Sequence, residues 1–220
     1  ICIKSDYSFD SIALFLALSQ RKCIIVPVVP TTDAEFQSKI VAASVHKVIS
    51  LKKDVLEIDK IIRISEEIPE KYLQIMNKGN SGLVLFSSGT TGVPKVMVHD
   101  LTVLIESFKI PKKQRRLNFL LFLLFDHIGG VNTLLNCLSN GSQITIPQNR
   151  NPEYILQLVQ DKKVQVLPTT PTFLNLILMT ENFGKYNISS LKMITYGTER
   201  MPQMLLDKLK NKIPHVKLTF

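Results

Sequence analysis

LVLFSSGTTGVPKVMVH occupies residues 83–99 and joins two apolar runs through a small polar loop. The β-branched and apolar residues at 83–86 and 95–98 predict two strands, and the Ser, Thr and Gly residues between them are typical of a turn. The loop is expected to return as a strand instead of opening a helix. The fold and the function are both inferred outward from this unit.

The chemistry of the loop suits an anion. Its glycines allow consecutive N–H groups to point into one concavity, its hydroxyls are further donors, and a lysine adds a positive charge. The GxxxxGK[ST] and GxGxxG patterns of other nucleotide sites are absent. A hairpin without a ligand is the alternative, but it does not account for Pro94-Lys95 directly after the loop. We therefore predict a phosphate site formed by Ser87, Ser88, Gly89, Thr90, Thr91, Gly92 and Lys95.

Runs that favour strands alternate with stretches of helical apolar spacing. Strands are expected at 1–4, 23–29, 47–50, 83–86, 95–98, 118–123, 143–146, 164–167, 191–195 and 216–220, and helices at 12–18, 34–43, 102–108, 131–138, 152–160, 171–179 and 202–209. Asp33 is a candidate N-cap, and residues 51–78 are expected to form a connector with at most a short strand at 61–64. This alternation predicts an α/β fold, a layered α/β/α body with mostly parallel sheets. Two subregions are expected, 1–78 with the first sheet and 79–220 with the phosphate loop and the second sheet.

Composition narrows the functional classes. The net charge of +9 would suit a polyanion partner, but the basic run at 109–116 lacks interleaved aromatic residues, which favours a solvated loop over a nucleic-acid surface. The three cysteines are too widely spaced for a metal or redox motif, and a reducing cytoplasm is expected. The longest apolar run, 119–125, is shorter than the ~20 residues that a membrane-spanning helix needs.

The loop with its lysine, residues 87–95, resembles the phosphate loop of the adenylate-forming enzymes. This superfamily includes acyl-CoA synthetases, peptide-synthetase adenylation domains and firefly-type luciferases. Residues 11–30 are similar to the family's helix followed by a VPLDP-like strand end, and residues 166–174 resemble its helix opening after a PT pair. Val96 departs from the pattern, since the family usually has Gly after the lysine. The resemblance implies the large N-terminal, AMP-binding domain of such an enzyme.

Asp126, His127 and Gly130 occupy the place of the family's acyl-pocket motif. In the acyl-CoA synthetases a His at the position of His127 borders the acyl tunnel, whereas in peptide-synthetase domains an Asp at the position of Asp126 holds the substrate amine. Capping of the helix that enters at Gly130 is the structural alternative for Asp126. No metal site is expected, because adjacent ligands on one strand end point apart.

The tetrad Tyr196-Gly197-Thr198-Glu199 looks like the family's YGxTE motif. Its position before Arg200-Met201-Pro202 and a predicted helix instead fits the earlier GGEPLP-like turn, whose backbone lines the adenine site. Gly197, Thr198 and Glu199 are therefore expected on the adenine side. The family's metal-binding Glu, catalytic Lys and C-terminal domain are then expected to follow Phe220, and this stretch alone is expected to be inactive.

The resemblance implies a ligase that uses ATP and Mg²⁺ to activate a carboxylic acid as an acyl-adenylate. Coenzyme A or the phosphopantetheine thiol of a carrier protein would accept the acyl group. An amino-acid-activating adenylation domain is one alternative, and a degenerate, non-catalytic nucleotide-binding module, suggested by Val96, is another. The expected ligands are a small carboxylic acid and ATP, with no nucleic acid and no membrane span. Apolar neighbours of the acyl-pocket motif lean towards an aliphatic or aryl acid.

Overall fold

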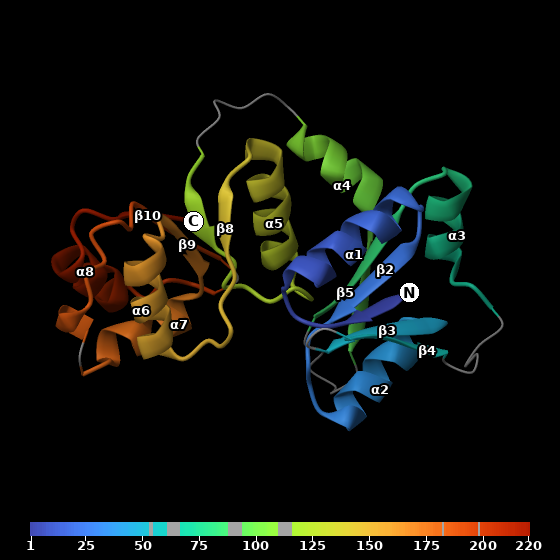
Figure 1. Cartoon of the computed structure of the whole chain (residues 1–220), viewed down its shortest axis with the longest axis horizontal. Coiled ribbons are helices and arrows are strands. Elements are labelled where there is room, and N and C mark those ends of the chain that lie inside the picture. The colour runs from blue at the N-terminus through green and yellow to red at the C-terminus, as the bar shows by residue number, and fades with distance from the viewer. Residues whose placement is uncertain (53–54, 61–66, 88–93, 110–115, 182, 198) are drawn as a thin grey trace. The chain divides into compact units, whose positions relative to one another are not determined.

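The computed structural model describes residues 1–52, 55–60, 67–87, 94–109, 116–181, 183–197 and 199–220 (Figure 1). The chain divides into two compact units, each with its own sheet. The first unit contains Ile1–Ile110 and Leu124–Val131, and the second contains Pro111–Leu123 and Asn132–Phe220. A short internal segment, Leu124–Val131, therefore belongs to the first unit although the residues on both sides of it belong to the second.

The first unit is built on a six-stranded sheet in the order β4-β3-β1-β2-β5-β6. Its inner strands pair in parallel, while β4 and β6 run antiparallel at the two edges. The strands are β1 (Cys2–Lys4), β2 (Ile24–Val28), β3 (Lys47–Lys52), β4 (Val55–Lys60), β5 (Gly82–Ser87) and β6 (Lys95–Asp100). The order reverses at β1, and in open α/β sheets such a reversal opens a crevice at the carboxyl ends of the strands.

Four helices belong to this unit: α1 (Phe9–Gln20), α2 (Asp33–Ala42), α3 (Glu70–Asn77) and α4 (Leu101–Phe108). Three of them are capped at the N-terminus by a side-chain oxygen that accepts a backbone N–H hydrogen bond. The capping residues are Ser8 for α1, Thr32 for α2 and Asp100 for α4. α1 packs along β2 (Figure 1). Since consecutive parallel crossovers are right-handed and β2 and β3 flank β1, α1 and α2 cover opposite faces of the sheet.

One face of the first sheet carries a closed apolar core. Residues of one parity along the parallel strands point to this face, as expected for the two-residue period of a strand. α2 contributes Phe36 and Ile40, α3 contributes Tyr72, and the strands contribute Cys2, Val26, Val28, Val48 and Val84. This packing anchors α2, which carries a lysine of the site described below.

The second unit has a five-stranded sheet in the order β11-β10-β9-β7-β8, with every pairing parallel. Its strands are β7 (Asn118–Leu120), β8 (Gln143–Thr145), β9 (Val166–Thr169), β10 (Met193–Tyr196) and β11 (Lys217–Thr219). The helices are α5 (Ile128–Asn140), whose first turn lies in the first unit, α6 (Pro152–Lys162), α7 (Pro171–Met179), the 3-10 helix η1 (Phe183–Lys185) and α8 (Gln203–Lys212). A large apolar core lies between this sheet and α6, α7 and α8.

The layered α/β architecture predicted from the sequence is confirmed. The predicted connector at 51–78 is wrong in part, because β3 extends to Lys52 and both β4 and α3 lie within it. The short strand predicted at 61–64 falls outside the described residues. Asp33 is the first residue of α2 instead of its N-cap, since the hydroxyl of Thr32 accepts the hydrogen bond from Glu35 N–H. The sequence suggested a boundary between two subregions at residues 78 and 79. In the structure β5 and β6, which follow that boundary, belong to the first sheet.

Candidate functional site

β5 and β6 hold the two ends of the predicted phosphate loop. They pair antiparallel, and Ser87, the last residue of β5, lies directly opposite Lys95, the first residue of β6. The predicted return of the chain as a strand is therefore confirmed. The side chain of Lys95 is exposed. The other predicted phosphate ligands, Ser88, Gly89, Thr90, Thr91 and Gly92, lie outside the described residues.

A cavity of about 360 Å³ opens at the carboxyl ends of β2 and β5. We call it the Lys39 cavity. It is bounded by the residues that follow β2, by one face of α2, by the end of β5 and by the segment after β7, namely Val29, Pro30, Thr31, Glu35, Lys39, Phe86, Leu124, Asp126 and His127. Two of the three residues predicted for an acyl pocket, Asp126 and His127, thus lie beside the strand that leads into the predicted phosphate loop.

Asp126 is held by two groups of the first unit. Its Oδ2 accepts hydrogen bonds from Val29 N–H and from Lys39 Nζ, each at 3.4 Å. The side chain is only 9% exposed, and burial raises the pKa of its carboxyl although Lys39 and the Val29 N–H act in the opposite direction. These contacts favour a role as a tether to α2 and β2 over the predicted cap of the following helix, which begins at Ile128.

Lys39 lies between two carboxylates. Its Nζ is 2.8 Å from Glu35 Oε1 and 3.4 Å from Asp126 Oδ2, and its side chain is 12% exposed. Burial lowers the pKa of the Lys39 ammonium, but the hydrogen bonds and charges of Glu35 and Asp126 outweigh it and leave the pKa raised. The ammonium also lies 5.6 Å from the centre of the Phe86 ring, within range of a cation–π contact.

Sequence reasoning did not identify Glu35 and Lys39 as site residues. The only local signal is that they stand four positions apart on one helix, which is a common surface arrangement.

The ring of His127 has a defined orientation. Its Nδ1 accepts a hydrogen bond of 3.1 Å from Gly129 N–H. With Nδ1 as the acceptor, the neutral imidazole carries its proton on Nε2. His127 also lines the Lys39 cavity.

Gly130, the third predicted acyl-pocket residue, is required by packing. A Cβ at this position would lie 2.1 Å from the carbonyl oxygen of Leu124 and 2.9 Å from the Tyr7 hydroxyl. The neighbouring Phe125 is fully buried, with its ring tilted against Tyr7 at 4.7 Å between ring centres and edge-on to Phe15 at 5.4 Å. Gly130 thus allows the start of α5 to approach the turn that positions Asp126 and His127.

The predicted adenine-side residues follow β10 in the second unit. Glu199 Oε2 accepts hydrogen bonds from Thr172 N–H at 3.1 Å and from Thr172 Oγ1 at 2.6 Å, in the first turn of α7. A carboxylate is favourable there because the first N–H groups of a helix lack partners within the helix. A Cβ on Gly197 would meet open space, and Thr198 lies outside the described residues. Glu199 therefore fastens the β10–α8 turn to α7.

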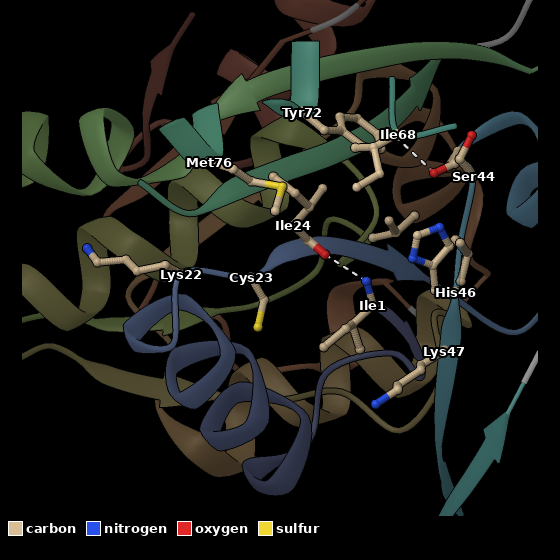
Figure 2. Close-up of a pocket in the computed structure, with 13 residues that line it drawn as sticks. Ile1, Lys22, Cys23, Ile24, Ser44, His46, Lys47, Ile68, Tyr72 and Met76 are labelled. Carbon is tan, nitrogen blue, oxygen red and sulfur yellow. Dashed lines mark hydrogen bonds between the residues drawn. The ribbon is translucent and has the colours of Figure 1, made fainter. Parts of the chain in front are cut away.

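A second cavity, also of about 360 Å³, lies at the amino ends of the parallel strands of the first sheet (Figure 2). Ile1, Ile24 and Lys47, at the amino ends of β1, β2 and β3, line it together with Tyr72 and Met76 of α3. Two of its polar groups are engaged in the fold, since Ile1 N donates to Ile24 O at 2.7 Å and the Tyr72 hydroxyl donates to Ala43 O at 3.0 Å, whereas the buried His46 Nε2 has no hydrogen-bond partner among the described residues. Ligands of open parallel sheets bind at carboxyl ends, so the Lys39 cavity is the better candidate site.

Within the part of the chain that the structure describes, no three His, Cys, Asp or Glu side chains come together as a metal site. None of the described helices is long and apolar enough to cross a bilayer.

A comparison with protein families matches residues 1–219 to the AMP-binding enzyme model. The chain belongs to the AMP-binding enzyme family. Among curated AMP-binding relatives, the 4-coumarate–CoA ligase CCL1 of Humulus lupulus is 30% identical over 142 residues, covering 60% of this chain and 26% of the relative. The 4-coumarate–CoA ligase 1 of Petroselinum crispum is 27% identical over 219 residues, covering 92% of this chain and 39% of the relative. The chain thus spans between a quarter and two-fifths of these two relatives.

Solved structures share the fold of this chain. The inhibitor-bound N-terminal domain of FACL13 from Mycobacterium tuberculosis aligns with a TM-score of 0.74 at 15% sequence identity, covering 99% of this chain and 60% of that one. Identity at this level supports the fold alone. The predicted family and fold class are confirmed.

Proposed function

We propose that this AMP-binding chain is part of an ATP-dependent ligase that activates a carboxylic acid as an acyl-adenylate. The observation that carries the proposal is the position of the β5–β6 hairpin. Phe86 borders the Lys39 cavity, Ser87 follows it directly, and Lys95 stands opposite Ser87. The Lys39 cavity and the two ends of the predicted phosphate loop thus meet at the carboxyl end of β5, which supports the proposal.

The reaction needs positioning and charge neutralisation more than covalent help from the protein. A carboxylate oxygen of the acid attacks the α-phosphorus of ATP, the bond to the β-phosphate breaks, and pyrophosphate leaves with its electron pair. We assign the pyrophosphate side to Ser87, Ser88, Gly89, Thr90, Thr91, Gly92 and Lys95, the adenine side to Gly197, Thr198 and Glu199, and the acid side to Asp126 and His127. Mg²⁺, when bound, would neutralise phosphate charge.

We propose transfer of the acyl group to coenzyme A or to the phosphopantetheine of a carrier protein. In this second step the thiol sulfur attacks the acyl carbon, a thioester forms and AMP leaves. Two curated relatives are 4-coumarate–CoA ligases, which supports coenzyme A as the acceptor. The apolar part of the cavity lining, including Phe86 and Leu124, supports an aliphatic or aryl acid.

The test is ATP–pyrophosphate exchange by the complete protein that contains this sequence. A panel of aliphatic, aryl and amino acids is supplied one at a time, with a reaction lacking acid as the control. Acid-dependent exchange, followed by AMP release on addition of coenzyme A, is the expected result. Binding of Mg-ATP without exchange for any acid would instead establish the alternative of a non-catalytic nucleotide-binding module.

A further inference from the structure

The Lys39 cavity contains a cation supplied by the chain itself. Lys39 reaches it from the last turn of α2, and Asp126 reaches it from a segment 87 residues later in the sequence. Both side chains are largely buried, at 12% and 9% exposure, whereas the second partner of Lys39, Glu35, is 49% exposed. Water screens the charge of Glu35 more than that of Asp126, so the interaction between Lys39 and Asp126 is the more buried of the two.

The pairing is specific to this position. A carboxylate as buried as Asp126 is unfavourable without a partner, and removing one member of a buried pair costs more than the pair contributes. The backbone N–H of Val29 is a further donor to the same Oδ2 atom. Asp126 therefore has hydrogen-bond donors before any substrate enters, and its charge is matched by the Lys39 ammonium.

A bound acid that carries an amino group would need an uncompensated anion in the cavity. Of the four titratable residues that line it in the described part of the chain, Lys39 and His127 are basic, Asp126 is paired with Lys39, and the Glu35 side chain is 49% exposed. An incoming ammonium would have to displace Lys39 or remain desolvated beside it, and either is unfavourable because like charges repel in a medium of low polarity. An acid without an amino group meets no such cost.

We propose that Lys39 is a specificity-determining residue, a fixed ammonium that pairs with Asp126 and restricts the cavity to carboxylic acids without an amino group. This inference rests on the proposed acid-activating function and decides between its acyl and amino-acid forms. Lys39 acts on the substrate through Asp126 and through its own charge.

The experiment compares two acids of one carbon skeleton, 3-phenylpropanoic acid and phenylalanine, in the complete protein. The kcat/KM of each is measured by ATP–pyrophosphate exchange, and the affinity of each by calorimetry without ATP. In Lys39→Met the carboxylate of Asp126 loses its partner, and the preference for the acid without the amino group should fall tenfold or more. In Asp126→Asn the ammonium remains, still paired with Glu35, and the preference should be kept or increased.

Three further variants separate specificity from folding. Lys39→Arg keeps a cation and should preserve the preference. Lys39→Met combined with Asp126→Asn removes both charges and should recover most of the preference lost in Lys39→Met. Lys71→Met replaces an exposed lysine of α3 and should leave both acids unchanged.

The outcomes distinguish this inference from the function on which it rests. Exchange in the unaltered protein with the same preference in Lys39→Met overturns the role of Lys39 and leaves the ligase function standing. A Lys39→Met protein that does not fold shifts the decision to Asp126→Asn, where a reduced preference overturns the proposal. No exchange and no binding of any acid by the unaltered protein overturns both.

Discussion

Lys95 illustrates how much a single residue contributes to the proposed site. It is the first residue of β6, exposed, and held opposite Ser87 by the ladder that joins β5 and β6. The backbone of this hairpin fixes where the side chain starts, while the four-carbon stem leaves the ammonium free to reach a phosphate.

Lys95→Ala is expected to weaken ATP-dependent activity of the complete protein by about ten- to a hundredfold, because a hydrogen bond to a charged group contributes about 1.5–3 kcal/mol. Steady-state kinetics with varied ATP would measure it. Lys71→Ala, at an exposed position of α3, is the matched control and should show no change. An unaltered ATP dependence in Lys95→Ala would remove this lysine from the site.

Gly130 is required because neighbouring atoms leave no room for a side chain, and no catalytic role is assigned to it. Gly130→Ala is expected to lower the free energy of unfolding by about 1–3 kcal/mol, because the added Cβ would overlap the Leu124 carbonyl, which belongs to the backbone and cannot turn aside. Denaturant unfolding would measure the loss. Gly184→Ala is the control, since nothing lies within 4 Å of a Cβ there. Equal stability of the two variants would show that the start of α5 can shift at little cost.

At the scale of the elements, local sequence signals predicted helix starts well and strand pairing poorly. The helices predicted at 152–160 and 171–179 do begin at 152 and 171, because their caps, Asn151 and Thr170, and the proline after each lie within a few residues of the helix start. β4 was not predicted, because a strand that is stabilised by pairing with another strand, here β3, leaves little signal in its own sequence. Its charged residues, in a stretch of weak alternation, give little sign of a strand.

The cap of α6 should be measurable. The side chain of Asn151 accepts hydrogen bonds from Glu153 N–H at 3.0 Å and Tyr154 N–H at 3.4 Å. Asn151→Ala is expected to lower the free energy of unfolding by about 1 kcal/mol, because these N–H groups have no partner within the helix. Gln157→Ala, at an exposed position of the same helix, should change stability by less than about 0.5 kcal/mol. A loss in Asn151→Ala no larger than in this control would contradict the capping role.

At the scale of the whole molecule, alternation of strands and helices predicted the α/β class because each segment carries its own periodicity. The Lys39 cavity could not be predicted in the same way. Its central ion pair joins residues 87 positions apart, and the sequence motif around Asp126 indicated a pocket without indicating its cation. The resemblance to the adenylate-forming enzymes indicated Asp126 and His127 as site residues. The proximity of Asp126 to Lys39 depends on the packing of Leu124–Val131 into the first unit, which the sequence does not show.

The reactivity of the cysteines can be used to test whether the cores of the two units are closed. Cys2 of the first unit and Cys137 of the second are fully buried, and burial raises the pKa of each thiol to about 12. At pH 8 such a thiol is ionised to only about one part in ten thousand, and the thiolate is the reactive form. Cys23 is partly exposed. Alkylation of the native protein is therefore expected at Cys23 long before Cys2 or Cys137, with all three reacting in denaturant.

Peptide-resolved mass spectrometry after timed labelling with iodoacetamide would measure the three rates separately. Because burial and the raised pKa both slow the reaction, raising the pH from 8 to 9 should speed labelling of Cys2 and Cys137 by no more than about tenfold while they stay buried. Opening of one unit alone would expose its own cysteine first. Labelling of Cys2 as fast as Cys23 in the native protein would contradict a closed core around β1, and with it the anchoring of α2 that holds Lys39 beside Asp126.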